Sequence, residues 1–215
     1  MCEWPSTSDP SSLLIGLRRQ PLLAVLRPLG IAQARLQLTQ LHQAGLWYVE
    51  LAVHTSPAWI AMASALVQEF PALHLGAASV RSSEDLAAAR QAGLGYVVSP
   101  ILDRELLEQA AVAGITFVPG VFSPTEIAQA LRWGAPAVKL YPAAALGPGY
   151  WRSLAGPLQP LPFCIAAGGL AVADAEAWFA AGVNAVALGS SLFCNDSLDP
   201  ALGELVVKLR SKCYP

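Results

Sequence analysis

Lys139 is the residue whose type and surroundings most directly suggest chemistry. It lies between Val138 and Leu140 in an apolar, strand-like run, whereas the two other lysines, Lys208 and Lys212, fall in a predicted solvent-facing final helix. Lysine is almost never buried without a partner or a purpose. Burial disfavours the charged ammonium and lowers its pKa, so the neutral amine can attack a ketone and form an imine. The alternative is a structural lysine paired with a carboxylate.

Glu50 is the natural partner of this lysine. It lies in the segment YVELAV with apolar residues on both sides, so we expect its carboxyl group to be buried as well. An apolar site raises the pKa of a carboxyl group toward the range in which it can act as a general acid and base. A simple ion pair with Lys139 predicts the same placement, so placement alone does not separate the two interpretations.

The elements that must position these residues follow a weak internal repeat. Helical segments end in Ala-Gly or a similar pair, and a β-branched run follows, as in AGLWYVEL, AGLGYVVSP, AGITFVPG and AGVNAVALG. Glycine at such a position provides the left-handed helix cap. Apolar runs predict strands at 22–27, 48–53, 74–80, 96–100, 116–121, 137–142, 163–168 and 185–189. Amphipathic stretches predict helices at 32–44, 57–70, 83–92, 103–113 and 124–133, with Ser83 and Ser123 as helix-capping residues.

Regular alternation of strands and helices favours a parallel sheet, and eight such units in 215 residues favour closure into a barrel. We therefore predict a (β/α)8 TIM barrel in which residues 1–215 form a single domain. A short leading helix at 11–20 is placed to plug the bottom of the barrel. An open doubly wound sheet is the alternative, although no glycine-rich dinucleotide fingerprint follows an early strand.

Bulk properties limit the class of function. Only 13% of residues are charged and 54% are hydrophobic, which indicates a thick core and helix surface covered by other subunits. The net charge of −2 gives no indication of nucleic-acid or membrane binding. We find no apolar run long enough to span a membrane and no signal-peptide pattern. The cysteines show no metal-ligand spacing, and we expect Cys164 to be a core residue of a cytoplasmic protein.

In a barrel of this kind, active sites lie at the carboxyl ends of the strands. The residues that meet this condition are Arg27, His54, Ser79, Pro100, Lys139, Gly168, Gly169, Gly189 and Ser190. The glycines follow the last two strands, where barrels frequently bind phosphate through backbone N–H groups. The sequence therefore predicts a phosphate site beside the lysine.

The ordered set of motifs resembles a known family, the 2-keto-3-deoxy-6-phosphogluconate (KDPG) and 4-hydroxy-2-oxoglutarate (KHG) aldolases. The motifs are AVLR, YVELAVHT, LGAASV, YVVSP, VPGV, VKLYPA, AAGG and VALGSSL, and they extend from about residue 22 to residue 192. The resemblance implies a class I aldolase, usually a homotrimer, that needs no metal or other cofactor. It implies cleavage of a phosphorylated keto acid to pyruvate and glyceraldehyde 3-phosphate, or of 4-hydroxy-2-oxoglutarate to pyruvate and glyoxylate.

By position, the resemblance makes Lys139 the imine-forming lysine and Glu50 the acid–base glutamate. It places Ser79 at a carboxylate-binding threonine position, Pro100 in the wall of the pocket and Tyr141 beside the lysine. It assigns phosphate binding to Gly168, Gly169 and Ser190, with Gly189 just before the serine, and matches Arg27 to an arginine found in some relatives.

The chain departs from the family pattern at three positions. His54 stands where many members have a carboxylate-binding arginine, Ala167 replaces a threonine, and Ile101 replaces a glycine. A histidine is neither reliably charged nor bidentate, so Arg27 is the candidate for the missing charge. These departures bear on the substrate more than on imine chemistry. Two other functions stay open: a barrel isomerase or epimerase of sugar phosphates, and an inactive relative that binds a keto acid or phosphate.

Overall fold

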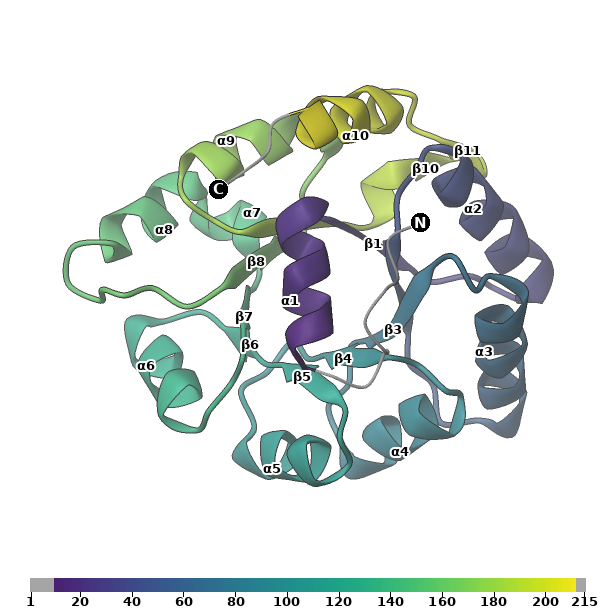
Figure 1. Ribbon diagram of the computed structural model, residues 1–215, viewed down its shortest axis with the longest axis horizontal. Coiled ribbons are helices and arrows are strands. Elements are labelled where there is room, and N and C mark those ends of the chain that lie inside the picture. Colours follow the sequence, from purple (N-terminus) through teal and green to yellow (C-terminus); the bar gives the residue numbers. More distant parts are fainter. Residues whose placement is uncertain (1–9, 212–215) are drawn as a thin grey trace.

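The computed structural model describes residues 10–211, and these form a ring of parallel strands surrounded by helices (Figure 1). Their apolar, β-branched runs suit strands that are buried on both faces. The strands of the sheet are β1 (Leu22–Leu26), β2 (Tyr48–Ala52), β3 (His74–Ala78), β4 (Tyr96–Val98), β5 (Thr116–Val118), β6 (Gly120–Val121), β7 (Val138–Leu140), β8 (Cys164–Ala167) and β9 (Ala185–Leu188).

The order of pairing shows how the sheet closes. It runs β5-β4-β3-β2-β1-β9-β8-β7-β6, so its two ends, β5 and β6, are consecutive in the chain. Only Pro119 separates them, and proline has no N–H to donate to a ladder. β5 and β6 therefore form one interrupted wall strand, and the predicted eight-unit barrel is confirmed. The alternative of an open doubly wound sheet is wrong.

Helices connect the strands and cover the outside of the ring, except for α1, which precedes the first strand and lies across one end of the ring. They are α1 (Pro10–Arg19), α2 (Ile31–Gln43), α3 (Pro57–Glu69), α4 (Ser83–Gln91), α5 (Arg104–Val112), α6 (Pro124–Arg132), α7 (Ala143–Leu146), α8 (Pro148–Leu154), α9 (Ala175–Ala180) and α10 (Ala201–Ser211). The short 3-10 helices η1 (Val172–Asp174) and η2 (Ser190–Leu192) and a hairpin of β10 (Phe193–Cys194) and β11 (Ser197–Leu198) complete the elements. The helices predicted with a range lie within one residue of the observed ones at each end, whereas α7 and α8 were not predicted and no range was predicted for α9 or α10.

Helix ends follow the expected local chemistry, with one correction. Glycines after the helices have φ between 66° and 94° at Gly45, Gly93, Gly114 and Gly182, the region that glycine adopts without strain. Ser123 caps α6 and forms a capping box with Glu126. The predicted cap at Ser83 is wrong, because Ser82 accepts the hydrogen bond from Asp85 N and Ser83 is the first residue of α4.

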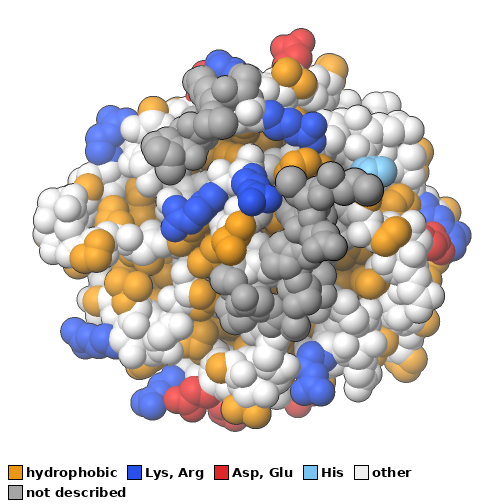
Figure 2. All heavy atoms as spheres, viewed as in Figure 1, with side chains coloured by type: hydrophobic (Ala, Val, Ile, Leu, Met, Phe, Trp, Pro, Cys, Tyr) orange, Lys and Arg blue, Asp and Glu red, His pale blue; other side chains and the backbone are white. Residues whose placement is uncertain are grey.

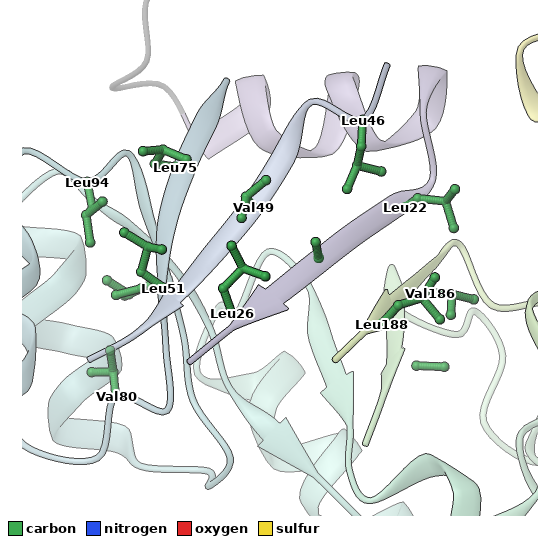
Figure 3. Close-up of a cluster of buried hydrophobic side chains, with 14 of the residues drawn as sticks. Leu22, Leu26, Leu46, Val49, Leu51, Leu75, Val80, Leu94, Val186 and Leu188 are labelled. Atoms are coloured by element: carbon green, nitrogen blue, oxygen red, sulfur yellow. The ribbon is translucent and has the colours of Figure 1, made fainter. Parts of the chain in front are cut away.

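The larger of two hydrophobic cores lies between the strands and the outer helices. Outward side chains of neighbouring strands lie side by side there, as Figure 3 shows for Leu22, Val49, Leu75 and Val186. Cys164 belongs to this core and is fully buried, as the sequence predicted, whereas Cys2, Lys212 and Cys213 lie outside the described residues.

The smaller core fills the interior of the barrel. Leu13 and Leu17 of α1 enter it, so the leading helix plugs one end of the barrel as predicted (Figure 1). The filling is uneven around the ring. β2 and β4 contribute the large side chains of Tyr48 and Tyr96, whereas the other side carries alanines at positions 137, 167, 185 and 187 beside the larger Phe163 and Ile165.

The face that carries α1 is mixed in character. Basic side chains lie both near its middle and around its rim, acidic ones lie toward its rim, and hydrophobic side chains are scattered between them (Figure 2). Arg18 of α1 lies over the ring of Phe163, 5.4 Å from its centroid. Within residues 10–211, no helix is both long enough and apolar enough to cross a membrane.

Candidate active site

Glu50 and Lys139 both lie inside the barrel. Each is the middle residue of a strand, and its flanking residues point outward into the larger core, so the alternation of a strand turns Glu50 and Lys139 inward. Relative exposure is 1% for Glu50 and 7% for Lys139. The two chemically promising residues of the sequence therefore share one water-poor interior.

The environment of Lys139 favours its neutral amine. Burial lowers the pKa of Lys139, the negative charge of Glu50 opposes that effect, and the positive charge of Arg27 adds to it. The amine lies 4.8 Å from the centroid of the Tyr141 ring. A lysine with a lowered pKa has a larger fraction of the free amine, the form that is nucleophilic.

The environment of Glu50 favours its protonated form more than water does. Burial raises the pKa of Glu50 to about 7, against opposing charges on Lys139 and Arg27. Neither carboxyl oxygen has a hydrogen-bond partner among the described residues. A carboxyl group with a pKa near neutrality can both give and take a proton at working pH.

Glu50 and Lys139 face the same interior without forming a direct ion pair. Among the described residues, the salt bridges join other groups, and no Lys139 nitrogen lies within 4.0 Å of a Glu50 oxygen. The simple ion pair of the structural interpretation is therefore not formed. The two groups act on each other electrostatically across this interior rather than through a contact ion pair.

Arg27 and Ser79 come together at the carboxyl ends of β1 and β3. The Arg27 guanidinium donates a long hydrogen bond of 3.5 Å to Ser79 Oγ. Ser79 has φ of 65°, a left-handed conformation that is strained for a residue other than glycine. A guanidinium and a hydroxyl held in this way provide donors for a carboxylate.

His54 lies farther out than the other candidates. It is exposed, and its Nδ1 accepts a hydrogen bond from Ser56 N at 3.1 Å. It shares a groove of about 780 Å³ with Arg27 and the apolar side chains of Trp59 and Met62. The structure therefore places His54 and Arg27 in one groove, whose lining does not include Glu50 or Lys139.

Pro100 lies against the strand next to the lysine. A Cβ added to Gly120 would meet the carbonyl carbon of Pro100 at 2.3 Å, so only glycine fits there. Gly120 is paired in register with Lys139. Sequence reasoning missed the role of Gly120, although a glycine within a strand signals a close backbone approach.

Tyr141 links the lysine to the first pair of glycines. Its ring faces Lys139, and a Cβ added to Gly168 would lie 2.8 Å from Tyr141 Cδ2. Gly168 and Gly169 have φ of 99° and 77°, so both conformation and space require glycine. The backbone at Gly168 therefore passes close to Tyr141, whose ring lies beside the lysine.

Gly189 and Ser190 line a second cavity, which reaches the first through Arg27. This cavity measures about 390 Å³ and also contacts Gln37 and Asp196. Ser191 Oγ, which was not predicted, donates a hydrogen bond of 2.7 Å to Leu170 O and so ties the ends of β8 and β9 together. The predicted phosphate residues thus follow the neighbouring strands β8 and β9, and Arg27 shares this cavity with Gly189 and Ser190.

Comparison with known proteins gives concordant results. Residues 15–202 match the family described as KDPG and KHG aldolase. The chain is 32% identical over 174 residues, 80% of this chain and 84% of the relative, to the 2-dehydro-3-deoxy-6-phosphogalactonate aldolase of Escherichia coli. It is 36% identical over 121 residues, 56% of this chain and 54% of the relative, to the 2-dehydro-3-deoxy-phosphogluconate aldolase of Pseudomonas aeruginosa. A solved structure described as native KDPGal matches with a TM-score of 0.78 and 28% identity, over 90% of this chain and 95% of that one.

Proposed function

Because this chain belongs to the KDPG and KHG aldolase family, we propose that it is a class I aldolase that cleaves a 2-keto-3-deoxy-6-phospho sugar acid to pyruvate and glyceraldehyde 3-phosphate. The resemblance predicted from the ordered motifs is confirmed by the family match. The observation that carries the proposal is a buried lysine with a lowered pKa that faces a buried glutamate with a raised pKa. The same chemistry would split 4-hydroxy-2-oxoglutarate into pyruvate and glyoxylate.

Lys139 would act as the nucleophile. Its neutral amine attacks the keto carbon to form a carbinolamine, and loss of water gives a protonated imine. The imine withdraws electrons from the C3–C4 bond, which breaks as the C4 hydroxyl loses its proton and becomes the aldehyde. The electron pair remains as an enamine, which is protonated at C3, and hydrolysis releases pyruvate and the amine.

Glu50 would move the protons of each step. In its protonated form it assists departure of the carbinolamine hydroxyl as water, and in its ionised form it accepts the proton of the C4 hydroxyl. It then returns that proton to C3 of the enamine. A group that serves as both acid and base works best when its pKa is near the working pH, which burial of Glu50 achieves.

The remaining residues would hold the substrate. The keto acid carboxylate would take donors from Ser79 and Arg27, with His54 at the outer edge of the groove, while Pro100 and Tyr141 shape the wall beside Lys139. The distant phosphate would bind to the backbone at Gly168, Gly169 and Gly189 and to Ser190, within reach of Arg27. Because the names of the two relatives differ in the sugar acid, both C4 epimers should be assayed.

Borohydride trapping with pyruvate tests the proposal. Reduction of an imine adds a pyruvate-sized mass that survives denaturation, so intact mass should show one adduct in the wild type. We expect none in Lys139→Ala and a normal adduct in Lys208→Ala, which removes an exposed lysine of α10. A folded wild type that gains no adduct in excess pyruvate would contradict the aldolase mechanism and favour an isomerase or a keto-acid-binding protein.

We further propose that the protein is a homotrimer, as the family resemblance implies. Large apolar side chains are exposed near the carboxyl ends of the strands, among them Leu29 at 96%, Phe122 at 49% and Ile101 at 42%. The low content of charged residues, 13%, points the same way, because surface covered by other subunits needs fewer charges.

A further inference from the structure

One row of the sheet brings Glu50 and Tyr96 to the same level of the barrel. Glu50 is paired with Gly76 across β2 and β3. Across β3 and β4, Ala77 is paired with Val97, so the preceding residues, Gly76 and Tyr96, continue the row. Paired residues of neighbouring strands point to the same side of a sheet. Glu50 and Tyr96 therefore both point into the interior, with a glycine between them.

The ring of Tyr96 occupies the space that Gly76 leaves free. A Cβ added to Gly76 would lie 2.5 Å from both Cε2 and Cζ of Tyr96. The ring thus leans across β3 toward β2, where its centroid lies 6.4 Å from that of Tyr48. Tyr48 stands two residues before Glu50 on the same face of β2. The Tyr96 hydroxyl is consequently carried toward the interior side chains of β2.

The Tyr96 hydroxyl and the Glu50 carboxyl group lack partners of their own. Tyr96 Oη and both Glu50 oxygens are buried without a hydrogen bond among the described residues. A buried polar group left unsatisfied is costly, so a donor and an acceptor in one apolar compartment have reason to pair. Burial and the charge of Glu50 hold the pKa of Tyr96 well above its usual value, which keeps the phenol protonated and able to donate.

A cavity lies beside Tyr96 at the end of the barrel opposite the strand ends that hold the candidate site. It measures about 190 Å³ and is lined by Tyr96, by the stacked rings of Tyr48 and His74, and by Ser12 and Leu13 of α1. Glu50 does not line this cavity, and the Tyr96 hydroxyl is itself closed to water, so water in the cavity does not compete with Glu50 as a partner for the phenol.

We propose that Tyr96 is a positioning residue that donates a direct hydrogen bond to the Glu50 carboxylate once that group is ionised and so sets both its orientation and its proton affinity. The catalytic importance of this contact rests on the function proposed above, whereas the contact itself does not.

The other groups that face Glu50 define what the contact would change. Lys139 from β7 and Arg27 from the end of β1 both favour the ionised carboxylate. Tyr48 lies below on β2, and Ser79 lies beyond the end of β3 as a neutral hydroxyl. A donor from Tyr96 also favours the ionised form, so its removal should raise the pKa of Glu50.

The test is an infrared titration of the protonated Glu50 carboxyl band, which Glu50→Gln identifies by its loss. In Tyr96→Phe we expect the midpoint to rise by about one pH unit, a tenfold change in the protonation equilibrium. Tyr48→Phe is the matched control, because it removes a neighbouring phenol hydroxyl from the same cluster, and its midpoint should equal that of the wild type. Equal midpoints in Tyr96→Phe and wild type, or equal shifts in both variants, would overturn the proposal.

Two further measurements keep the proposal testable if Tyr96→Phe does not fold or if the infrared band alone is ambiguous. If Tyr96→Phe fails to fold, Gly76→Ala offers a second route, because its methyl group must push the ring away from Glu50 and should raise the midpoint similarly. The acid limb of the pH profile of kcat/KM should move with the infrared midpoint. The infrared result needs no turnover, so a missing borohydride adduct would refute the aldolase while leaving the Tyr96 contact to be judged separately.

Discussion

Glu50 imposes a cost on the folded protein that depends on pH. In the unfolded chain its carboxyl group titrates near 4.5, whereas burial raises the pKa in the folded protein to about 7. Between these two pKa values, the folded protein therefore keeps a proton on Glu50 that the unfolded chain would release. The stability associated with this group is complete below about pH 4.5 and is lost as the pH rises toward 7.

Replacing Glu50 with glutamine should remove this loss. Melting curves at pH 5 and pH 8 should show Glu50→Gln gaining stability over the wild type as the pH rises, by up to about 3 kcal/mol. Glu204→Gln, an exposed glutamate of α10, serves as the control and should follow the wild type at both pH values. A constant difference between Glu50→Gln and wild type would contradict the raised pKa.

At the level of single residues, the sequence predicted those placements that depend on the local pattern of apolar and polar residues. Apolar flanks on both sides were sufficient to place Lys139 and Glu50 inside the barrel, because strand alternation fixes the direction of a side chain. The approach of Tyr96 to Gly76 could not be predicted in this way. It depends on the register between strands that are distant in sequence, and a register is defined only when the sheet has formed.

Among the elements, the wall strand interrupted at Pro119 is under the tightest steric limit. Gly120 resumes the strand, pairs with Lys139 and leaves no room for a side chain against Pro100. The neighbouring atoms are backbone, which cannot rotate away as a side chain can. A methyl group here would displace the strand that lies beside the lysine.

Gly120→Ala should accordingly destabilise the protein by more than about 2 kcal/mol and lower its activity. Gly149→Ala is the matched control, since a Cβ added at Gly149 in α8 meets nothing within 4 Å. Because alanine favours a helix, Gly149→Ala should leave the stability unchanged or raise it by up to about 1 kcal/mol. Thermal melts of both variants would decide, and similar losses in the two would refute the steric argument.

The predictability of the elements follows their length and periodicity. The strands and the longer helices were located to within a few residues, because apolar runs and glycine caps repeat along the chain. α7 and α8 were missed because each is short and Gly147 and Pro148 interrupt the segment that contains them. Short helices of this kind depend on packing against the sheet, which local sequence does not reveal.

For the whole molecule, the assembly state is the next quantity to measure. The chain has a mass of 22.6 kDa, so light scattering coupled to gel filtration should give about three times that value if the trimer forms. Dilution of the sample over a wide range controls for weak association. A mass equal to one chain at the highest concentration would contradict the trimer.

The uneven filling of the barrel interior matters to anyone who would re-engineer it. Tyr48 and Tyr96 fill most of the space at their side of the lumen, and the residues across it at positions 137, 167, 185 and 187 are small alanines. Side-chain volume can therefore be moved from one side of the lumen to the other, but the total volume cannot be increased. A larger residue at Ala185 or Ala187 should be accepted only in company with a smaller one at Tyr48 or Tyr96, so these sites would have to be mutated and selected as pairs.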